Sequence, residues 1–380
     1  MNDIKAIKVR IYPNKSQKVL IEKHFGCCRF IYNYALEQKI KSYNKESKKS
    51  KSKYDIINQI TQLKKTKECE WLNEVYSQSL QQSVLDLDSA FTRFFKHQNQ
   101  FPKFKSKKHP SRSYRIPKDL KLNRTQKYLR IPKVKWVKFK DEFKIPEDIK
   151  ILNATVSRSG NEYYVSICYK ILDYKEPEQK QIKEQTTIGI DLGIKDYAIL
   201  SNGKKYQNHK FIKKYEDELA KQQKKLSKKQ KDSNSYIKQK NIVNKVHKKI
   251  KNCRLDKINK LVKELVDNQN YEAFAIEDLS IQKMQQEGHH ELAKLISDAG
   301  WYMFSTKLKY KSEECGKNVI KIGRFEPSSK LCTCGKINDE LKLSDRTWVC
   351  KECGTEHDRD ILAANNIKNF ALKSLGKNFV

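Results

Sequence analysis

Three acidic residues lie at points of this 380-residue chain where carboxylates from separate elements could converge. Asp191 and Glu277 each follow a short apolar run that predicts a buried strand, and Asp360 is predicted to open a helix containing Ala363 and Ala364. Grouped carboxylates bind hard cations such as Mg²⁺ or Mn²⁺, and two such cations about 4 Å apart catalyse phosphodiester cleavage. The sequence therefore predicts Asp191, Glu277 and Asp360 as metal ligands and catalytic residues.

Chance is the alternative explanation, because a chain with 45 acidic residues places some of them at strand ends in any fold. The run Ile-Asp-Leu-Gly would not decide the matter alone, but three such sites in a very basic chain favour a shared centre. Asp196, Asp278 and Asp358 are the neighbours that could be confused with ligands. Side chains alternate along a strand, so we expect Asp278 to point away from Glu277. Asp358 is expected to support the loop or the ligands.

Four cysteines near the C-terminus form two close pairs, Cys332 with Cys334 and Cys350 with Cys353, each followed by glycine. Thiolates at this spacing bind Zn²⁺ tetrahedrally, and glycine permits the tight turn after each pair. Unrelated buried thiols are the alternative. The first pair has one intervening residue where two are usual, which tightens its loop. We predict a structural zinc site, because four protein ligands leave no open position for chemistry.

The charge of the chain predicts a polyanionic partner. Lys and Arg number 80 against 45 Asp and Glu, which gives a formal net charge of +35. Such an excess repels itself unless an anion neutralises it, and binding through many phosphates weakens steeply with salt. A lysine-rich composition from an A/T-rich genome is the alternative, but it does not explain the shortage of acids.

The sequence predicts no membrane partner and a cytoplasmic location, with association to the nucleoid when the protein is bound to DNA. No apolar run approaches the ~20 residues of a membrane span, and the first residues lack the apolar region of a signal peptide. The ten cysteines are expected to be thiols or metal ligands in that compartment.

Elements in the first half must position a nucleic-acid surface. Basic residues interleave with aromatic ones from 101 to 139, a pattern suited to stacking unpaired bases and also to the core of a small β-barrel that includes the N-terminal strand. Polar residues 172–185 predict a linker. The expected elements are a strand at 4–12, helices at 14–36 and 71–97, an exposed loop at 41–54 and a hairpin at 154–170.

Elements in the second half must position the acids. A lysine-dense helical hairpin is expected at 210–267, broken near 232–235, and its contact with nucleic acid stays open against a merely solvated face. The other expected elements are two strands within 186–207, strands at 272–277 and 318–323, a helix at 290–314 and a last helix from 360.

These residues resemble the OrfB/TnpB family of insertion-sequence proteins, relatives of the type V CRISPR effector nucleases. The resemblance covers nearly the whole chain. It is carried by Tyr12-Pro13, Gln17, residues 26–33, Gln81-Gln82, Ala90-Phe91, residues 101–107, 327–330 and 344–348, the cysteine pairs and residues 357–360. Two departures are the shortened first cysteine pair and Leu362, where asparagine commonly precedes the two alanines.

The resemblance implies an α/β and α+β multidomain fold. Its expected parts are a wedge-like β-barrel (1–13 and 111–175), a helical recognition lobe (14–110), a RuvC-like, ribonuclease H-type nuclease (183–328 and 356–380) and a zinc-ribbon insertion (329–355). It also implies an RNA-guided DNA endonuclease with one RuvC-like site. The guide RNA would come from the transposon end, the target would be double-stranded DNA beside a short flanking motif, and a separate transposase from the same element is a further partner to consider.

Two other functions stay open at this point. A catalytically silent, RNA-guided DNA-binding repressor would use the same basic surface, although this sequence keeps all three acids. A transposase that joins DNA ends is the third candidate. It is disfavoured because His289-His290 lie in a polar segment without the tyrosine partner that single-strand transposases use.

Overall fold

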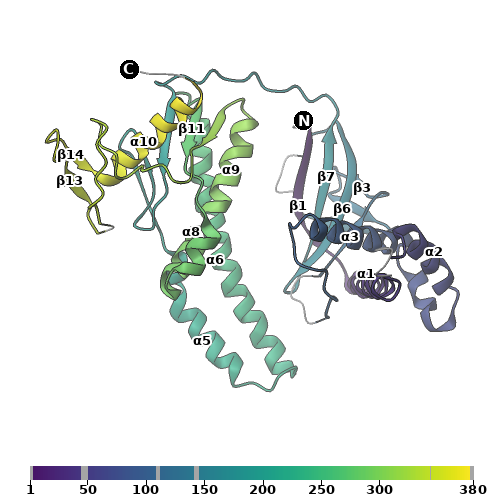
Figure 1. Cartoon of the computed structure of the whole chain (residues 1–380). Helices are drawn as coiled ribbons and strands as arrows, with labels where there is room; N and C mark the ends of the chain where they lie inside the picture. The colour runs from purple at the N-terminus through teal and green to yellow at the C-terminus, as the bar shows by residue number, and fades with distance from the viewer. Residues whose placement is uncertain (1–2, 44–49, 108–111, 141–144, 343, 377–380) are drawn as a thin grey trace. The chain divides into compact units, whose positions relative to one another are not determined.

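The computed structural model describes residues 3–43, 50–107, 112–140, 145–342 and 344–376 (Figure 1). The chain divides into two compact units, Met1–Tyr174 and Lys175–Val380, and the division falls inside the polar segment 172–185. Each unit contains its own sheet. Within the described ranges, no helix combines the length and the apolar character needed to cross a membrane.

The first unit contains a seven-stranded antiparallel sheet in the order β2-β6-β7-β1-β5-β4-β3. Its strands are β1 (Ile4–Tyr12), β2 (Arg112–Ile116), β3 (Lys121–Asn123), β4 (Tyr128–Ile131), β5 (Lys135–Phe139), β6 (Ile149–Ser159) and β7 (Glu162–Ile171). The predicted hairpin is confirmed, because β6 and β7 pair across a turn in which Gly160 has a φ of 59°. The N-terminal strand belongs to the same sheet, as predicted.

The predicted closed barrel is not formed by the described residues. β2 and β3 lie at opposite edges of the sheet, and no pairing between them joins the described residues into a ring. Helices cover the β2 side instead, where Phe25 and His24 pack on the ring of Tyr114. Because helices bury this apolar surface, the sheet does not need to close on itself to do so.

In the part of this unit that the structure describes, four helices accompany the sheet. They are α1 (Lys15–Lys41), α2 (Lys53–Leu63), the 3₁₀ helix η1 (Lys67–Glu74) and α3 (Ser77–Phe95). The predicted loop 41–54 ends earlier than expected, because Ser52 and Asp55 form a capping box that starts α2 at Lys53. Residues 44–49 of that predicted loop lie outside the described residues. Helix α2 packs through the buried side chains of Ile56 and Ile60.

One apolar core joins these helices to the sheet. It includes Ile31 and Leu36 of α1, Leu80 of α3, Ile116 of β2 and Val165 of β7, all fully buried. Burial of one such side chain contributes roughly 1.5–3 kcal/mol to folding. The helices and the sheet therefore form a single packed unit, and their division into a recognition lobe and a wedge domain stays a prediction.

The second unit contains a five-stranded sheet in the order β10-β9-β8-β11-β12. Its strands are β8 (Thr187–Asp191), β9 (Asp196–Leu200), β10 (Lys205–Gln207), β11 (Ala273–Ile276) and β12 (Asn318–Lys321). The three strands β8, β11 and β12 run parallel, while β9 and β10 are antiparallel to their neighbours. β11 consists entirely of buried apolar residues, which is typical of a central parallel strand.

Helices and a small two-stranded sheet complete this unit. They are α4 (Phe211–Lys214), α5 (Glu216–Ser227), α6 (Asn234–Asp267), α7 (Ile281–Glu287), α8 (His290–Ala299), α9 (Trp301–Glu313), α10 (Arg359–Ser374), β13 (Thr347–Val349) and β14 (Glu356–Asp358). Helices α5 and α6 form the predicted hairpin (Figure 1). The helix predicted at 290–314 is two helices, because Gly300 adopts a left-handed φ of 67° between α8 and α9.

Helix α10 packs on β8 at very short range. A Cβ atom added to Gly189 would lie 1.9 Å from the carbonyl oxygen of Ala364, so only glycine fits at this position. Ala363 and Ala364 are buried, as their small size predicted. This close packing brings the first turn of α10 toward the sheet that carries the other two acids.

Candidate functional site

Three elements bring the predicted carboxylates into one region. Strands β8 and β11 are parallel neighbours in which Ile190 pairs with Ile276, so Asp191, the last residue of β8, and Glu277, the residue after β11, lie at neighbouring strand ends. Asp360 lies in the first turn of α10, the helix that packs on β8. The predicted acids are thus collected from positions 191, 277 and 360, which are distant in the sequence.

The electrostatics of Asp191 show that the acids influence one another. Burial and the negative charges of Glu277 and Asp360 raise the pKa of Asp191 to about 7, while Arg359 opposes the increase. Desolvation and like charge both disfavour the ionised carboxylate. A divalent cation would remove this repulsion, so the donor chemistry fits a hard metal ion.

Two arginines hold Asp360. Arg346 Nη1 lies 3.0 Å from its Oδ2, and Arg359 Nη2 lies 2.9 Å from its Oδ1. The backbone N–H of Arg359 also donates to the carbonyl of Arg346 at 2.8 Å, which fixes the loop before β13 against the start of α10. These contacts neutralise the charge of Asp360 and orient it.

A serine holds Glu277. Ser328 Oγ donates a 2.6 Å hydrogen bond to Oε1 of Glu277. The buried side chain of Asn366 on α10 in turn donates to the carbonyls of Ser328 and Leu331, both at 2.7 Å. Helix α10 therefore carries Asp360 and also supports the loop that orients Glu277.

Two of the neighbouring acids, Asp278 and Asp358, have partners of their own. Asp278 pairs with Arg324 at 2.6 Å and with Lys321 at 3.4 Å, and the hydrogen bond from Arg324 holds the pKa of Asp278 below its ordinary value. Asp358 caps α10 by accepting hydrogen bonds from the backbone N–H groups of residues 360 and 361, both at 3.1 Å. Lys205 contacts the other oxygen of Asp358 at 2.7 Å.

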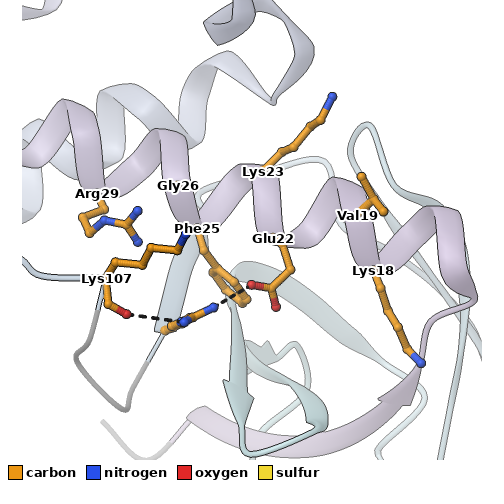
Figure 2. A pocket seen from close by; sticks show the side chains of 9 residues that line it. Lys18, Val19, Glu22, Lys23, Phe25, Gly26, Arg29 and Lys107 are labelled. Carbon is orange, nitrogen blue, oxygen red and sulfur yellow. Dashed lines mark hydrogen bonds and ion pairs between the residues drawn. The ribbon is translucent and has the colours of Figure 1, made fainter. Parts of the chain in front are cut away.

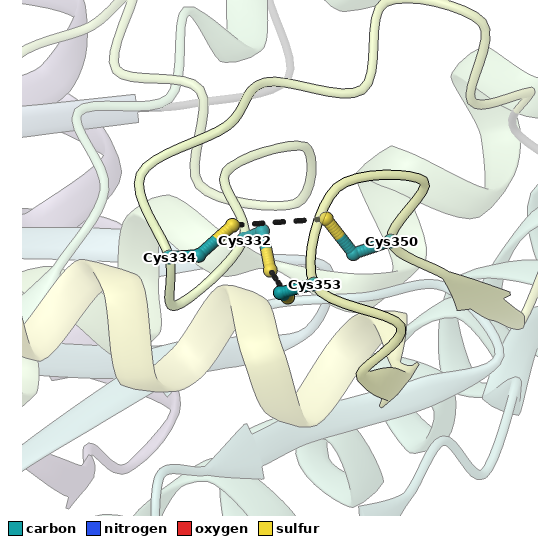
Figure 3. A group of neighbouring side chains, drawn as sticks. All are labelled: Cys332, Cys334, Cys350 and Cys353. Carbon is teal, nitrogen blue, oxygen red and sulfur yellow. Dashed lines mark hydrogen bonds between the residues drawn. The ribbon is translucent and has the colours of Figure 1, made fainter.

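The four predicted cysteines form a compact cluster (Figure 3). Among the described residues, Cys332, Cys334, Cys350 and Cys353 are the group whose metal-ligand atoms all lie within 4.8 Å of one another. The Cys332 and Cys353 sulfurs are 3.5 Å apart, and the Cys334 and Cys350 sulfurs are 3.7 Å apart. Four thiols at this separation fit the tetrahedral ligand set of a structural metal ion.

The shortened first cysteine pair is accommodated by its turn. Gly335 N–H donates to the carbonyl of Cys332 at 3.0 Å, and Gly354 N–H donates to the carbonyl of Cys350 at 2.9 Å. Both glycines have positive φ, 92° and 72°. The first turn therefore closes over one residue fewer than the second, and its two sulfurs still reach the cluster.

Two further side chains adjoin the sulfurs. His357 Nε2 lies 3.1 Å from the Cys332 sulfur, and burial lowers the pKa of His357, which favours the neutral ring. Hydrogen bonding with Thr355 lowers the pKa of Cys353 to about 6. A thiol that ionises readily is a better metal ligand.

A separate basic depression of about 510 Å³ lies along α1 in the first unit (Figure 2). Its lining is Lys18, Val19, Glu22, Lys23, Phe25, Gly26, Arg29, Lys107 and Arg112. Burial opposes the ionisation of Glu22, but hydrogen bonds from Arg158 and Tyr163 keep its pKa below the ordinary value. Arg158 and Tyr163 thus bind the Glu22 carboxylate, and most of the charged side chains that line the depression are cations.

The sequence reasoning missed the residues that hold the acids. Ser328 and Arg346 lie in segments that carried the family resemblance, and Arg359 adjoins Asp360, but no role was predicted for any of them. A serine or arginine close to a motif is the available signal, and its partner becomes visible only through tertiary contacts. Asn366 gives no local signal.

Comparisons with known proteins match several parts of the chain to family models and most of its length to relatives. Family models described as "Probable transposase" (OrfB of the IS605 type), "Cas12f1-like, TNB domain" and "Helix-turn-helix domain" match residues 166–287, 301–367 and 1–49. In the last range the described residues form strand β1 and the single helix α1.

Two curated relatives are similar over nearly their full length. A Streptomyces pristinaespiralis protein named "Putative RNA-guided DNA endonuclease" is 34% identical over 96% of this chain and 88% of its own. An Escherichia coli K12 protein named "Putative RNA-guided DNA endonuclease InsQ" is 29% identical over 97% of this chain and 92% of its own. A solved chain from the "Cas12f1-sgRNA-target DNA complex" has the same overall fold, with a TM-score of 0.55, 12% identity, and coverage of 96% of this chain and 98% of that chain.

Proposed function

Because this chain belongs to the OrfB/TnpB family, we propose that it is an RNA-guided DNA endonuclease encoded by an insertion sequence. The family membership is supported by relatives named as putative RNA-guided DNA endonucleases. They are similar to this chain over nearly its whole length. The observation that carries the catalytic part is the raised pKa of Asp191, which reflects its burial beside Glu277 and Asp360. Half-buried carboxylates that repel one another are suited to binding cations.

Asp191, Glu277 and Asp360 would hold Mg²⁺ or Mn²⁺ and form a single RuvC-like site. The bound cations would activate a water and stabilise the leaving oxygen of the phosphodiester. Asp191 would give up its proton on becoming a ligand, so cation binding would compete with its protonation near neutral pH. Ser328 orients Glu277 through its hydrogen bond, and Asp360 would turn from at least one of Arg346 and Arg359 to bind a cation.

The four cysteines would hold Zn²⁺ in a structural role. Their sulfurs surround one point, and all four positions of a tetrahedral ion would be filled by the protein. This zinc would fix residues 329–355 as an insertion beside the start of α10. The zinc-bound loop includes Arg346, so its order would also help to place Asp360.

Base pairing of a guide RNA with one DNA strand would supply sequence discrimination, while the protein grips the duplex backbone. The charge of +35 supports this division, because many phosphates must be neutralised. We propose that the guide derives from the transposon end and that the target is double-stranded DNA beside a short flanking motif. The proposed parts are the wedge domain (1–13 and 111–175), the recognition lobe (14–110), the nuclease (183–328 and 356–380) and the zinc insertion (329–355).

The basic depression along α1 is a candidate phosphate-binding surface for this complex (Figure 2). Lys18, Arg29 and Lys107 lie in its lining. Flexible lysines suit contacts to a phosphate backbone of any sequence.

The test is cleavage by purified protein bound to its co-purifying RNA. The RNA is sequenced, and DNA that matches it is supplied with Mg²⁺ beside a library of flanking motifs. Asp191→Ala and Glu277→Gln should lower cutting by orders of magnitude without loss of RNA-guided DNA binding. Glu287→Gln, at an exposed position on α7, is the matched control and should cut as the wild type does. Binding without cutting by the wild type would instead support the repressor.

A further inference from the structure

Phe325 is an aromatic side chain left almost wholly in water. It is 94% exposed, the greatest exposure among the large apolar side chains of the described ranges. It lies in the loop that connects β12 to the cysteine cluster, between Arg324 and Glu326. Among the described residues of the second unit, the apolar core clusters do not include this ring.

The loop that carries Phe325 is anchored on both sides. Before the ring, Arg324 Nη2 contacts the Asp278 carboxylate at 2.6 Å and Nε contacts the Asp278 carbonyl at 3.4 Å. After the ring, Ser328 Oγ donates to Glu277 at 2.6 Å. The two anchors are consecutive residues at the end of β11. The ring is therefore held on a short, fixed span beside a proposed metal ligand.

The chemistry around the ring favours a nucleobase as its occupant. A single exposed ring offers far less apolar surface than the roughly 1,200 Å² of a stable protein interface, whereas one ring face is enough to stack a base. Lys330 and the Asp278-paired cations Lys321 and Arg324 lie near it in sequence, in a chain with a net charge of +35. Bases inside a duplex are already stacked on both faces, so the ring would take an unpaired base.

We propose that Phe325 stacks on an unpaired base of the DNA strand that enters the carboxylate site, and so places the phosphodiester to be cut beside Asp191 and Glu277. This inference rests on the proposed endonuclease function. It assigns to the loop 323–328 a double role: Ser328 orients a metal ligand, and Phe325 orients the substrate strand.

Cleavage by the full chain with its co-purified RNA tests the proposal. Phe325→Ala should slow cutting of matched DNA roughly 5- to 150-fold, the range expected for loss of one base–aromatic stack. Phe325→Trp should retain the rate, because indole stacks at least as well. Tyr302→Ala is the matched control. Tyr302 is 75% exposed on α9 in the same unit but shares none of the anchoring contacts, so its loss should leave cutting unchanged.

A fluorescence measurement separates stacking from a general effect on the loop. DNA with 2-aminopurine at successive positions of each strand is bound to RNA-loaded protein carrying Glu277→Gln, which keeps the strand intact. Quenching at one position should be lost with Phe325→Ala and kept with Phe325→Trp. Unchanged quenching in the alanine variant, or wild-type cutting by it, overturns this inference alone. Failure of the wild type to cut any matched DNA overturns the proposed function and this inference with it.

Discussion

Replacement of Asp191 by asparagine should stabilise the second unit at high pH when no divalent cation is present. Burial and the charges of Glu277 and Asp360 raise the pKa of Asp191 from 3.8 to about 7. The folded state therefore binds this proton more tightly than the unfolded state does. The stabilisation is fully present below pH 3.8 and is lost as pH rises through 7, because the ionised carboxylate is disfavoured only in the folded state.

The size of the effect follows from these two pKa values. Relative to the protonated form, the free energy of unfolding falls by about 1.7 kcal/mol at pH 5, where the unfolded chain ionises, and by about 4.3 kcal/mol at pH 8. Between these pH values the wild type should lose roughly 2.5 kcal/mol that Asp191→Asn does not lose. The uncharged asparagine keeps the shape of the side chain, so the comparison isolates the charge.

Urea unfolding in Mg²⁺-free buffer measures this difference, with reporters in the second unit. Asp256→Asn is the control. Its exposed pair with Lys260 is worth only about 0.3–0.5 kcal/mol, so it should follow the wild-type pH dependence. Added Mg²⁺ should stabilise the wild type at pH 8 and should affect Asp191→Asn much less. Equal pH dependence of wild type and Asp191→Asn would refute the electrostatic coupling of the three acids.

Three further predictions concern single contacts. Ser328→Ala removes the hydrogen bond to Glu277 and should slow cutting about 10-fold, as a loss of roughly 1–1.5 kcal/mol; unchanged single-turnover rates would show that this contact does not orient the acid. Cys334→Ser should release the bound zinc, measured by atomic absorption, and lower the unfolding temperature; exposed Cys315→Ser is the control, and equal metal content in both would contradict the site. Burial lowers the pKa of His24, so the wild type should lose stability as pH falls below about 6.5. In acid unfolding experiments His24→Gln should lose less stability over this range. Parallel pH profiles of the two proteins would contradict this role of His24.

The positions of the acids at the ends of elements could be predicted from local pattern. Apolar residues before Asp191 and Glu277 predicted two buried strands, and the structure places both acids where those strands end. The cysteine cluster was also predictable, because the spacing of the sulfurs and the following glycines are local features. Local periodicity and turn chemistry carry this information without the rest of the fold.

The partners of the acids could not be predicted, because they depend on tertiary contacts between charges. The chain has 35 more basic than acidic residues, so the sequence did not indicate that Arg346 and Arg359 are the two that pair with Asp360. The closure of the first sheet, which the described residues do not show, also could not be decided from the sequence. The residue patterns of the short strands β2 and β3 are the same in a closed barrel and in an open sheet. Tertiary contacts, such as the helix packing near Tyr114, distinguish the two arrangements.

Helix boundaries were missed where polar residues dominate. The lysine-rich run before α2 concealed the capping box formed by Ser52 and Asp55. Gly300 split a helix that periodicity alone extended from 290 to 314. In both places polar residues or a glycine set where a helix begins or ends. The spacing of apolar residues does not reveal such positions.

The central claim is that Asp191, Glu277 and Asp360 bind a pair of divalent cations. Anomalous diffraction from crystals of the RNA-loaded protein grown with Mn²⁺ tests it most directly. We predict two manganese peaks roughly 4 Å apart, ligated by these three carboxylates, with Asp360 turned away from at least one of its arginines. Manganese bound elsewhere, with Asp360 still paired to Arg346 and Arg359, would contradict the account.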